Sequence, residues 1–359
     1  MRLAQFSINQ FRNLLDVQFD ASSGVNLITG QNASGKTSLL EAIYYLSHIR
    51  SFRTQHVSDL INHQHKYFEL VARLHQQNEQ RIPVGIRRSR QKLVARMNQQ
   101  DIRRVADIAA SFPVLAIHPD SYRLITAGPG ERRQFIDWGV FHVEHDFFDA
   151  WQRYRRALKQ RNSAIRAGQQ RRLCRMWDNE LVTMAEHIHR LRTSYMAELQ
   201  PVLNRLIEEF FPGKEIQCEY GRGWSEESDL ADLLEQRLTQ DMKRGYTSVG
   251  PQRADLKISV AGQSAQTGIS RGQQKMLVAL LRLGQAMQFS DKNNRPCVLL
   301  YDDLPSELDE ENRARIMHIL RGMRIQLFIT AIEPEQLDLS AWKYKKMFHV
   351  EHGKLSELV

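Results

Sequence analysis

The sequence predicts an α/β protein in which one domain is built from both ends of the chain and a mainly helical domain is inserted between them. Three observations predict this class. Strand-like patterns fill the first hundred residues and return after residue 245. The stretch between them is mostly helical in pattern. The length of 359 residues allows two domains. We therefore expect one domain made of 1–100 and 245–359, and an inserted domain of 101–244.

The N-terminal part is predicted to be a set of strands around one helix. Residues 3–8 and 15–19 alternate polar and apolar side chains, as half-buried strands do. Residues 25–29 form a more apolar run that ends at Gly30, which is typical of a central strand. A helix with a broad apolar face follows. Residues 66–97 indicate an antiparallel meander.

The middle of the chain is predicted to contain a long helix. A heptad-spaced apolar series begins at Trp177 and continues through Leu181, Met184, Ile188, Leu191 and Tyr195. We expect a packed bundle or a short antiparallel pair, because a long coiled-coil arm would need many more heptads. Pro201 is expected to kink or break this helix.

The C-terminal part returns to alternating strands and helices. Its predicted strands are 254–260, 297–301 and 325–330, its predicted helices are 270–287 and 310–320, and a closing hairpin is expected around 348–353.

Composition narrows the function classes. Apolar residues make up 42% and charged residues 25%, which excludes collagen-like, fibrous and wholly disordered chains. Lys and Arg number 50 against 41 Asp and Glu, and the net charge of +9 favours an anionic partner such as nucleic acid. The three cysteines, Cys174, Cys218 and Cys297, indicate neither a disulfide framework nor a zinc ribbon. No segment has the length of a membrane span, so we expect a cytoplasmic protein with no membrane partner.

One octapeptide carries a nucleotide-binding pattern. It fits G-x-x-x-x-G-K-[ST] and comprises Gly30, Gln31, Asn32, Ala33, Ser34, Gly35, Lys36 and Thr37. Its glycines allow a tight loop whose backbone N–H groups face phosphate oxygens, at the positive end of the following helix. Lys36 would reach the β- and γ-phosphates, and Thr37 would give its hydroxyl to Mg²⁺. The pattern predicts ATP and Mg²⁺ as cofactors.

Two carboxylates end the predicted strand 297–301. Asp302 is placed to hold Mg²⁺, directly or through water, opposite Thr37. Asp303 is the candidate to orient or deprotonate the attacking water. The alternative is an acidic turn that only closes a strand. Upstream, Ser270 and Gly272 stand at a predicted helix start, for which a simple capped helix is the alternative.

The order of these motifs resembles that of ABC-type ATPases. Their residues are similar to those of the RecF-like family of SMC- and Rad50-related DNA repair proteins. The resemblance covers residue 2 to about residue 350, and its fold would be an ABC-ATPase-like P-loop head with an inserted helical domain. The similar segments are 11–14, 51–54, 130–133, 250–256, 270–275 and 302–309.

The resemblance implies a homodimer induced by ATP, with the loop 30–37 of one subunit facing Ser270 and Gly272 of the other. It places Lys36, Asp303, Ser270 and Gly272 in catalysis, and Arg12 and Asn13 near the nucleotide. It also implies a weak, DNA-dependent ATPase that binds single-stranded, gapped or junction DNA. The implied partners are RecO and RecR, in recombinase loading, replication and the SOS response.

Several positions depart from that pattern. Asp303 stands where ABC ATPases commonly have Glu, and its shorter side chain suggests slow hydrolysis. Thr330 replaces the usual switch His, and Gln252 stands where relatives often have His. His118 is a candidate for the position that often holds Gln, which the sequence leaves open.

A basic segment is one of two candidate DNA contacts. Between Trp151 and Arg175 there is no acidic residue. A solvated helix surface is the alternative there, and a rival basic patch lies in 50–92. The basic residues of the segment are Arg153, Arg155, Arg156, Lys159, Arg161, Arg166, Arg171, Arg172 and Arg175.

Two other classes share part of the motif set. The ATPase subunit of a membrane transporter has the same motifs but a far shorter helical insert. A small-molecule P-loop kinase leaves Ser270 and the segment 306–309 unexplained. The thirteen histidines show no metal-ligand spacing, so ordinary surface or packing roles are expected for them.

Overall fold

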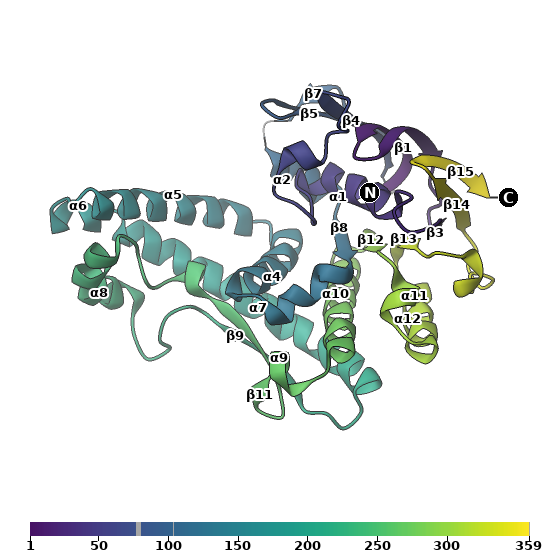
Figure 1. Ribbon diagram of the computed structural model, residues 1–359. Coiled ribbons are helices and arrows are strands. Elements are labelled where there is room, and N and C mark those ends of the chain that lie inside the picture. The colour runs from purple at the N-terminus through teal and green to yellow at the C-terminus, as the bar shows by residue number, and fades with distance from the viewer. Residues whose placement is uncertain (77–79, 103, 359) are drawn as a thin grey trace. The chain divides into compact units, whose positions relative to one another are not determined.

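The computed structural model describes residues 1–76, 80–102 and 104–358, and Figure 1 labels most of their elements. Contacts between residues divide the chain into two compact units. The head unit comprises Met1–Ser121 and Leu281–Val359, and the middle unit comprises Tyr122–Leu280. The predicted class is confirmed, because an α/β unit is built from both ends of the chain and a mainly helical unit lies between them in sequence.

The head unit contains a six-stranded sheet in the order β15-β14-β3-β13-β12-β8. All its neighbours pair in parallel except β14 and β15, which form the predicted hairpin. Four of its strands are buried along their whole length, which explains their mainly apolar sequences. The strands are β3 (Val25–Thr29), β8 (Val114–Ile117), β12 (Cys297–Tyr301), β13 (Ile325–Thr330), β14 (Lys345–Glu351) and β15 (Lys354–Leu358).

A second, antiparallel sheet of the head unit has the order β2-β1-β4-β5-β6-β7. The predicted strands and meander are confirmed, and only the short β7 was not expected. Alternate residues of β4 and β5 are buried, as their period-two pattern indicates. The strands are β1 (Arg2–Phe11), β2 (Leu14–Asp20), β4 (Tyr67–His75), β5 (Arg81–Ser89), β6 (Leu93–Met97) and β7 (Gln100–Asp101).

Helix α1 (Lys36–His48) links these sheets through one hydrophobic core. The Tyr45 ring meets the rings of Phe11 and Phe68 edge-on, at centroid distances of 6.3 and 5.2 Å. Because α1 begins directly after the predicted nucleotide loop, this packing fixes the loop's position. The other helices of the head unit are α2 (Val105–Ser111), α11 (Leu304–Glu307), α12 (Glu310–Gly322) and the C-terminal part of α10 (Arg271–Asn293), with 3-10 turns at Val57–Asp59, Pro119–Tyr122 and Pro334–Gln336.

The boundaries of the units differ from those expected from the sequence. Strand β8 pairs in parallel with β12, so the head unit extends to Ser121 rather than to residue 100. At the other end, β10 pairs with β9 in the middle unit, which extends to Leu280 rather than to residue 244. Strand pairing between distant segments is a tertiary property that local patterns do not carry.

The middle unit is mainly helical, with one three-stranded sheet in the order β11-β10-β9. The predicted long helix is α7. It runs through Pro201 without ending there, so of the expected kink or break the break is wrong, and a kink stays a prediction. Strand β9 was not expected. The elements are α3 (Arg123–Thr126), α4 (Pro129–Val143), α5 (Phe147–Arg166), α6 (Arg171–Arg175), α7 (Asp178–Phe210), β9 (Ile216–Gly221), α8 (Leu230–Arg244), a 3-10 turn (Pro251–Arg253), β10 (Asp255–Val260), β11 (Gln263–Ser264), α9 (Ala265–Gly268) and the start of α10.

Two of the family-like segments meet inside the middle unit. Arg132, in 130–133, donates from Nε and Nη2 to the two carboxylate oxygens of Asp255, at 2.7 and 3.0 Å. Arg133 donates to the carbonyl of Ala254 at 2.8 Å. These segments therefore stabilise the fold of this unit by joining α4 to the start of β10. No described helix is long and apolar enough to cross a bilayer.

Candidate nucleotide-binding site

The loop 30–37 lies at the carboxyl end of β3 and leads into α1. Gly30 and Gly35 have φ values of 145° and 127°, in the region that favours glycine. A Cβ on Gly30 would clash with the carbonyl oxygen of Val350, and one on Gly35 would lie 3.0 Å from Asn13 Nδ2. Both glycines are therefore required by backbone conformation and by close neighbours.

Two segments from opposite ends of the chain hold this loop. Asn13 Nδ2 and the backbone N–H of Gly353 each donate to the carbonyl oxygen of Ser34, at 3.0 Å. Gly353 sits in the turn of the β14–β15 hairpin, a role that the hairpin's sequence does not reveal. Within the described residues, the buried Ser34 hydroxyl has no hydrogen-bond partner. A polar atom of this kind in a glycine-bounded loop fits a phosphate ligand.

The side chain of Lys36 folds back onto the start of the loop 30–37. Its Nζ donates to the carbonyl oxygens of Gly30 at 2.6 Å and Gln31 at 3.1 Å. Burial lowers the pKa of Lys36, and the carboxylates of Asp303 and Asp302 oppose this shift. The ammonium group therefore lies beside the backbone of the first two residues of the loop.

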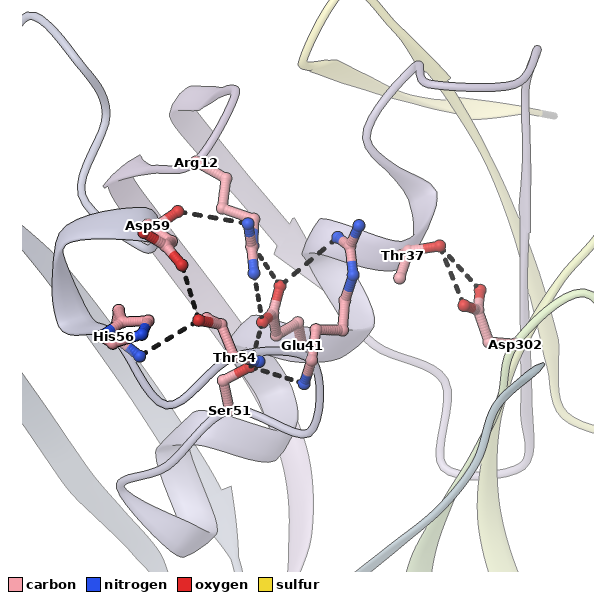
Figure 2. A network of polar contacts seen from close by, with 9 residues as sticks. Arg12, Thr37, Glu41, Ser51, Thr54, His56, Asp59 and Asp302 are labelled. Carbon is pink, nitrogen blue, oxygen red and sulfur yellow. Dashed lines mark hydrogen bonds and ion pairs between the residues drawn. The ribbon is translucent and has the colours of Figure 1, made fainter. Parts of the chain in front are cut away.

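Thr37 and Asp302 meet across the carboxyl ends of β3 and β12 (Figure 2). Thr37 Oγ1 donates to the carboxylate of Asp302, with oxygen separations of 2.9 and 3.1 Å. A hydroxyl and a carboxylate at this spacing form a hard-oxygen donor set, which is the type that Mg²⁺ prefers. The residues present therefore fit the cation that the sequence predicts.

The Asp302 carboxylate is buried, and its environment shifts its pKa. Burial raises its pKa, while hydrogen bonds from Thr330 and Thr37 lower it. Thr330 Oγ1 donates to Asp302 Oδ1 at 2.8 Å and accepts from the backbone N–H of Asp303 at 2.7 Å. Thr330, noted in the sequence only as a replacement for a histidine, thus fixes both carboxylate residues.

Asp303 occupies an unusual backbone conformation for a non-glycine residue. Its φ is 57°, and Ser306 Oγ donates to its Oδ1 at 2.8 Å. The carboxylate is thereby oriented by the start of α11. The last residue of this segment, Asp309, caps α12 by accepting from the backbone N–H of Asn312 at 2.8 Å.

A buried carboxylate, which the sequence reading missed, organises the neighbouring loop (Figure 2). Glu41 has a fully buried side chain and accepts a bidentate contact from Arg12, with Nη2 to Oε1 at 2.8 Å. Ser51 also donates to Glu41, and Arg53 lies 3.7 Å from it. Arg12 further donates to the carbonyl of Asp59 at 3.2 Å. The available signal for a buried carboxylate was a charged residue among the apolar residues Leu39, Leu40 and Ile43.

Ser270 and Gly272, which the resemblance implies to face the partner's nucleotide, lie in the middle unit. Ser270 precedes α10, its hydroxyl accepts from the N–H of Gln273 at 3.3 Å, and its own N–H donates to Gln273 Oε1 at 3.2 Å. This is the reciprocal pattern of a capping box. Gly272 is exposed, with open space where a Cβ would lie. The start of α10 is therefore a well-defined helix N-terminus with accessible backbone.

Part of the predicted basic segment is unavailable to a phosphate. Arg161 is fully buried and contacts Asp178 at 2.8 Å and Asp241 at 3.0 Å. Arg153 and Arg175 form ion pairs with Glu180 and Glu235. Including Arg161 among the surface cations was wrong, because its position on α5 faces the interior. The exposed side chains outside these ion pairs are Arg155, Arg156, Lys159, Arg166, Arg171 and Arg172.

Two positions at which the sequence was compared with the family pattern, His118 and Gln252, have structural partners. The His118 ring follows β8 and stacks on Phe52, at a centroid distance of 4.5 Å. Gln252 contacts the hydroxyl of Tyr154 and donates to the carbonyl of Val249 at 2.8 Å.

Among the described residues, no group of three or more His, Cys, Asp or Glu side chains could hold a metal.

Comparison with known proteins agrees with this geometry. Residues 2–356 match the family model for the RecF/RecN/SMC N terminal domain. The chain is 42% identical over 363 residues to "DNA replication and repair protein RecF" of Cellvibrio japonicus, with 99% of each chain covered. The protein of the same name from Vibrio atlanticus is 37% identical over 358 residues, with 99% of this chain and 100% of that protein covered.

Solved structures show the same fold. The recombination mediator protein RecF-ATP of the RecFOR pathway superposes with a TM-score of 0.89 and 26% identity, covering 100% of this chain and 98% of that one. An Smc head bound to the C-winged helix domain of ScpA has a TM-score of 0.60 at 15% identity, with 100% and 98% covered, and so supports the fold alone. The transporter alternative is not favoured by these matches. The chain belongs to the RecF family of DNA replication and repair proteins, with an ABC-ATPase-like head.

Proposed function

We propose that this protein is an ATP-dependent DNA-binding protein of recombinational repair and replication. It binds single-stranded or gapped DNA as an ATP-induced homodimer and helps RecO and RecR to load recombinase. It acts in the cytoplasm and in the SOS response. The observation that carries the proposal is the meeting of Thr37 and Asp302 at the carboxyl edge of the head sheet, beside the glycine loop.

ATP is held by the loop 30–37 in this proposal. Backbone N–H groups of the loop and the N-terminus of α1 bind the phosphates, and Lys36 moves from the carbonyls of Gly30 and Gln31 to the β- and γ-phosphates. Arg12 and Asn13 line the same side of the site. Thr37 and Asp302 hold Mg²⁺, which supplies charge neutralisation to the phosphates.

Hydrolysis is slow and stimulated by DNA. Asp303 orients or deprotonates the attacking water, and Ser306 and Thr330 fix its orientation. An aspartate reaches less far than the glutamate common in ABC ATPases, which favours a weak ATPase. Slow hydrolysis would prolong the ATP-bound dimer on DNA.

Dimer formation depends on a contact made in trans. Ser270 and Gly272, at the N-terminus of α10, face the γ-phosphate bound by the partner subunit. ADP lacks that group, so the dimer loosens after hydrolysis. Two-fold symmetry makes the same contact at both sites.

Sedimentation velocity tests this proposal with the full chain and Mg²⁺. The wild-type protein should sediment as a dimer with ATP and as a monomer with ADP. Lys36→Arg should stay monomeric with ATP. Ser270→Arg should bind ATP with little change in affinity but stay monomeric, because its side chain obstructs only the partner's site.

Two outcomes would contradict the shared site. One is an ATP-induced dimer of Ser270→Arg. The other is loss of ATP affinity by monomeric Ser270→Arg. Gapped DNA added to the ATP-bound wild-type protein should shift it to a larger, salt-sensitive complex.

A further inference from the structure

A cavity of about 700 Å³ lies in the head unit, away from the nucleotide loop. Pro296, Arg324 and Ser23 line it, and each directly precedes the start of β12, β13 or β3 or lies within two residues of it. The loop 30–37 and Asp302 follow the opposite, carboxyl ends of β3 and β12. The cavity and the nucleotide site are therefore at opposite edges of the same parallel sheet.

The lining of this cavity is strongly basic. Arg2, Arg73, Arg81 and Arg324 line it together with His75, and among the described residues that line it Asp20 is the single acidic one. Within 1–76, 80–102 and 104–358, none of these four arginines forms an ion pair with a carboxylate. Among the described lining residues, the four arginines and Asp20 leave an excess of three positive charges around one space, which favours an anion there.

Neutral groups orient two of these guanidinium groups without cancelling their charge. Arg73 Nη1 donates to Gln5 Oε1 at 2.7 Å, and Arg324 donates to Asn294 Oδ1. The Nε of Arg2 is buried and lacks a hydrogen-bond partner in the described part of the chain. Gln5 and Asn294 also line the cavity. The arrangement leaves further N–H donors of several arginines for a bound group.

We propose that this cavity is a second anion site, which binds a phosphate-bearing ligand independently of the ATP loop. Guanidinium forks match phosphate oxygens in pairs, and a volume of this size is typical of ligand sites. The phosphate comes from a nucleic-acid strand or from a free mononucleotide. The two sources share the chemistry that the arginines recognise.

The test compares two variants of equal charge. Arg73→Gln/Arg324→Gln removes two lining cations, whereas Lys66→Gln/Arg104→Gln removes two exposed cations of the head unit that do not line the cavity. Each protein is first saturated with ADP and Mg²⁺ to occupy the nucleotide loop. Inorganic phosphate, AMP and a 12-nucleotide single strand are then titrated by calorimetry. Arg81→Gln, a single exposed substitution, serves as a second lining variant.

The lining variant should bind inorganic phosphate at least tenfold more weakly than the control variant. Loss of oligonucleotide affinity, with a salt slope reduced by about 0.7 for each lost phosphate contact, identifies a strand phosphate as the source. Loss of AMP affinity with unchanged oligonucleotide binding identifies a mononucleotide. Equal affinities of the lining and control variants for all three probes would overturn the proposal. ATP-induced sedimentation of the lining variant should be unchanged, which separates this site from the proposed ATPase cycle.

Discussion

Arg12 Nη2 donates to Glu41 Oε1 at 2.8 Å, and this ion pair joins the turn after β1 to helix α1. The next residue after Arg12 is Asn13, which holds the carbonyl of Ser34 in the nucleotide loop. The buried carboxylate of Glu41 also accepts from Ser51. One side chain of α1 therefore fixes two segments, the turn at Arg12 and the loop at Ser51, and the first of these also holds the loop 30–37 through Asn13.

Glu41→Gln should weaken both the fold and the nucleotide site. The Glu41 side chain is 0% exposed and that of Arg12 is 18% exposed, so little solvent can replace the lost charge. We expect the free energy of unfolding in urea to fall by about 1–3 kcal/mol, and the affinity for ATP to fall with it. Glu69→Gln is the control, because its ion pair with Arg87 is more exposed, at 58% for Arg87 and 30% for Glu69, and should contribute much less to stability. Equal losses in the two variants would refute the role of Glu41.

Glu41 was missed in the sequence, whereas the neighbouring glycine loop 30–37 was found, and this difference shows what the sequence could predict. The strands 25–29, 297–301 and 325–330 were predicted to the residue, because mainly apolar runs end at Gly30, Asp302 and Thr330. The glycine loop and Asp302 were found because local spacing carries their chemistry. Glu41 was missed because its partner lies 29 residues away in sequence.

Other unpredicted features share this tertiary origin. Strand β8 joins the head sheet through a partner almost two hundred residues away, so the domain boundary near residue 101 could not be placed from local pattern. Arg161 looked like a surface cation because its sequence neighbours are basic, whereas its acidic partners come from α7 and α8. Pro201 lies within α7, where a break was expected.

Asp302→Asn should stabilise the nucleotide-free protein at pH 7 and abolish its stabilisation by Mg²⁺ and ATP. Burial raises the pKa of Asp302 above 3.8, so its favourable contribution is complete below the unfolded pKa and is lost as the pH rises through the folded pKa. At pH 7 the variant no longer buries a charge. Thermal melts of the wild-type protein and the variant at pH 4 and pH 7 measure the difference in stability. A difference of 1 kcal/mol in unfolding free energy at the midpoint shifts Tm by about 2–4 °C or less. A wild-type gain in Tm with Mg²⁺ and ATP that persists in Asp302→Asn would contradict the assigned magnesium role.

Asp303→Asn should slow ATP turnover while leaving the fold intact. The amide oxygen can still accept from Ser306, but it cannot take a proton from water. We expect a fall of roughly 10²-fold in kcat with little change in ATP affinity. Ser306→Ala, which keeps the carboxylate but removes its donor, should cause a smaller loss. Unchanged turnover in Asp303→Asn would refute the proposed role in hydrolysis.

Reversal of Arg155, Arg156 and Lys159 to Glu should flatten the salt dependence of DNA binding. These side chains are exposed and lie outside the ion pairs that hold Arg153 and Arg161. Each lost phosphate contact should reduce the slope of log affinity against log salt by about 0.7 for a single strand. The matched variant reverses Arg50, Arg90 and Lys92 in the rival patch. A flattened slope in that variant alone would move the DNA contact to the head unit.

Asp241→Asn should destabilise the middle unit more than any surface ion-pair variant of that unit. Asp241 and Arg161 are both fully buried, and Arg161 also donates to Thr247 at 2.7 Å. Removing one charge leaves the buried guanidinium with Asp178 alone, so we expect unfolding free energy to fall by about 3–5 kcal/mol. Glu235→Gln breaks the exposed pair with Arg175 and should cost under about 1 kcal/mol. Urea unfolding followed by tryptophan fluorescence measures both, since Trp151 and Trp177 lie in this unit. A loss below about 1 kcal/mol in Asp241→Asn would mean that Asp178 alone suffices to neutralise Arg161, and that the buried pair is not what holds α5 against α8.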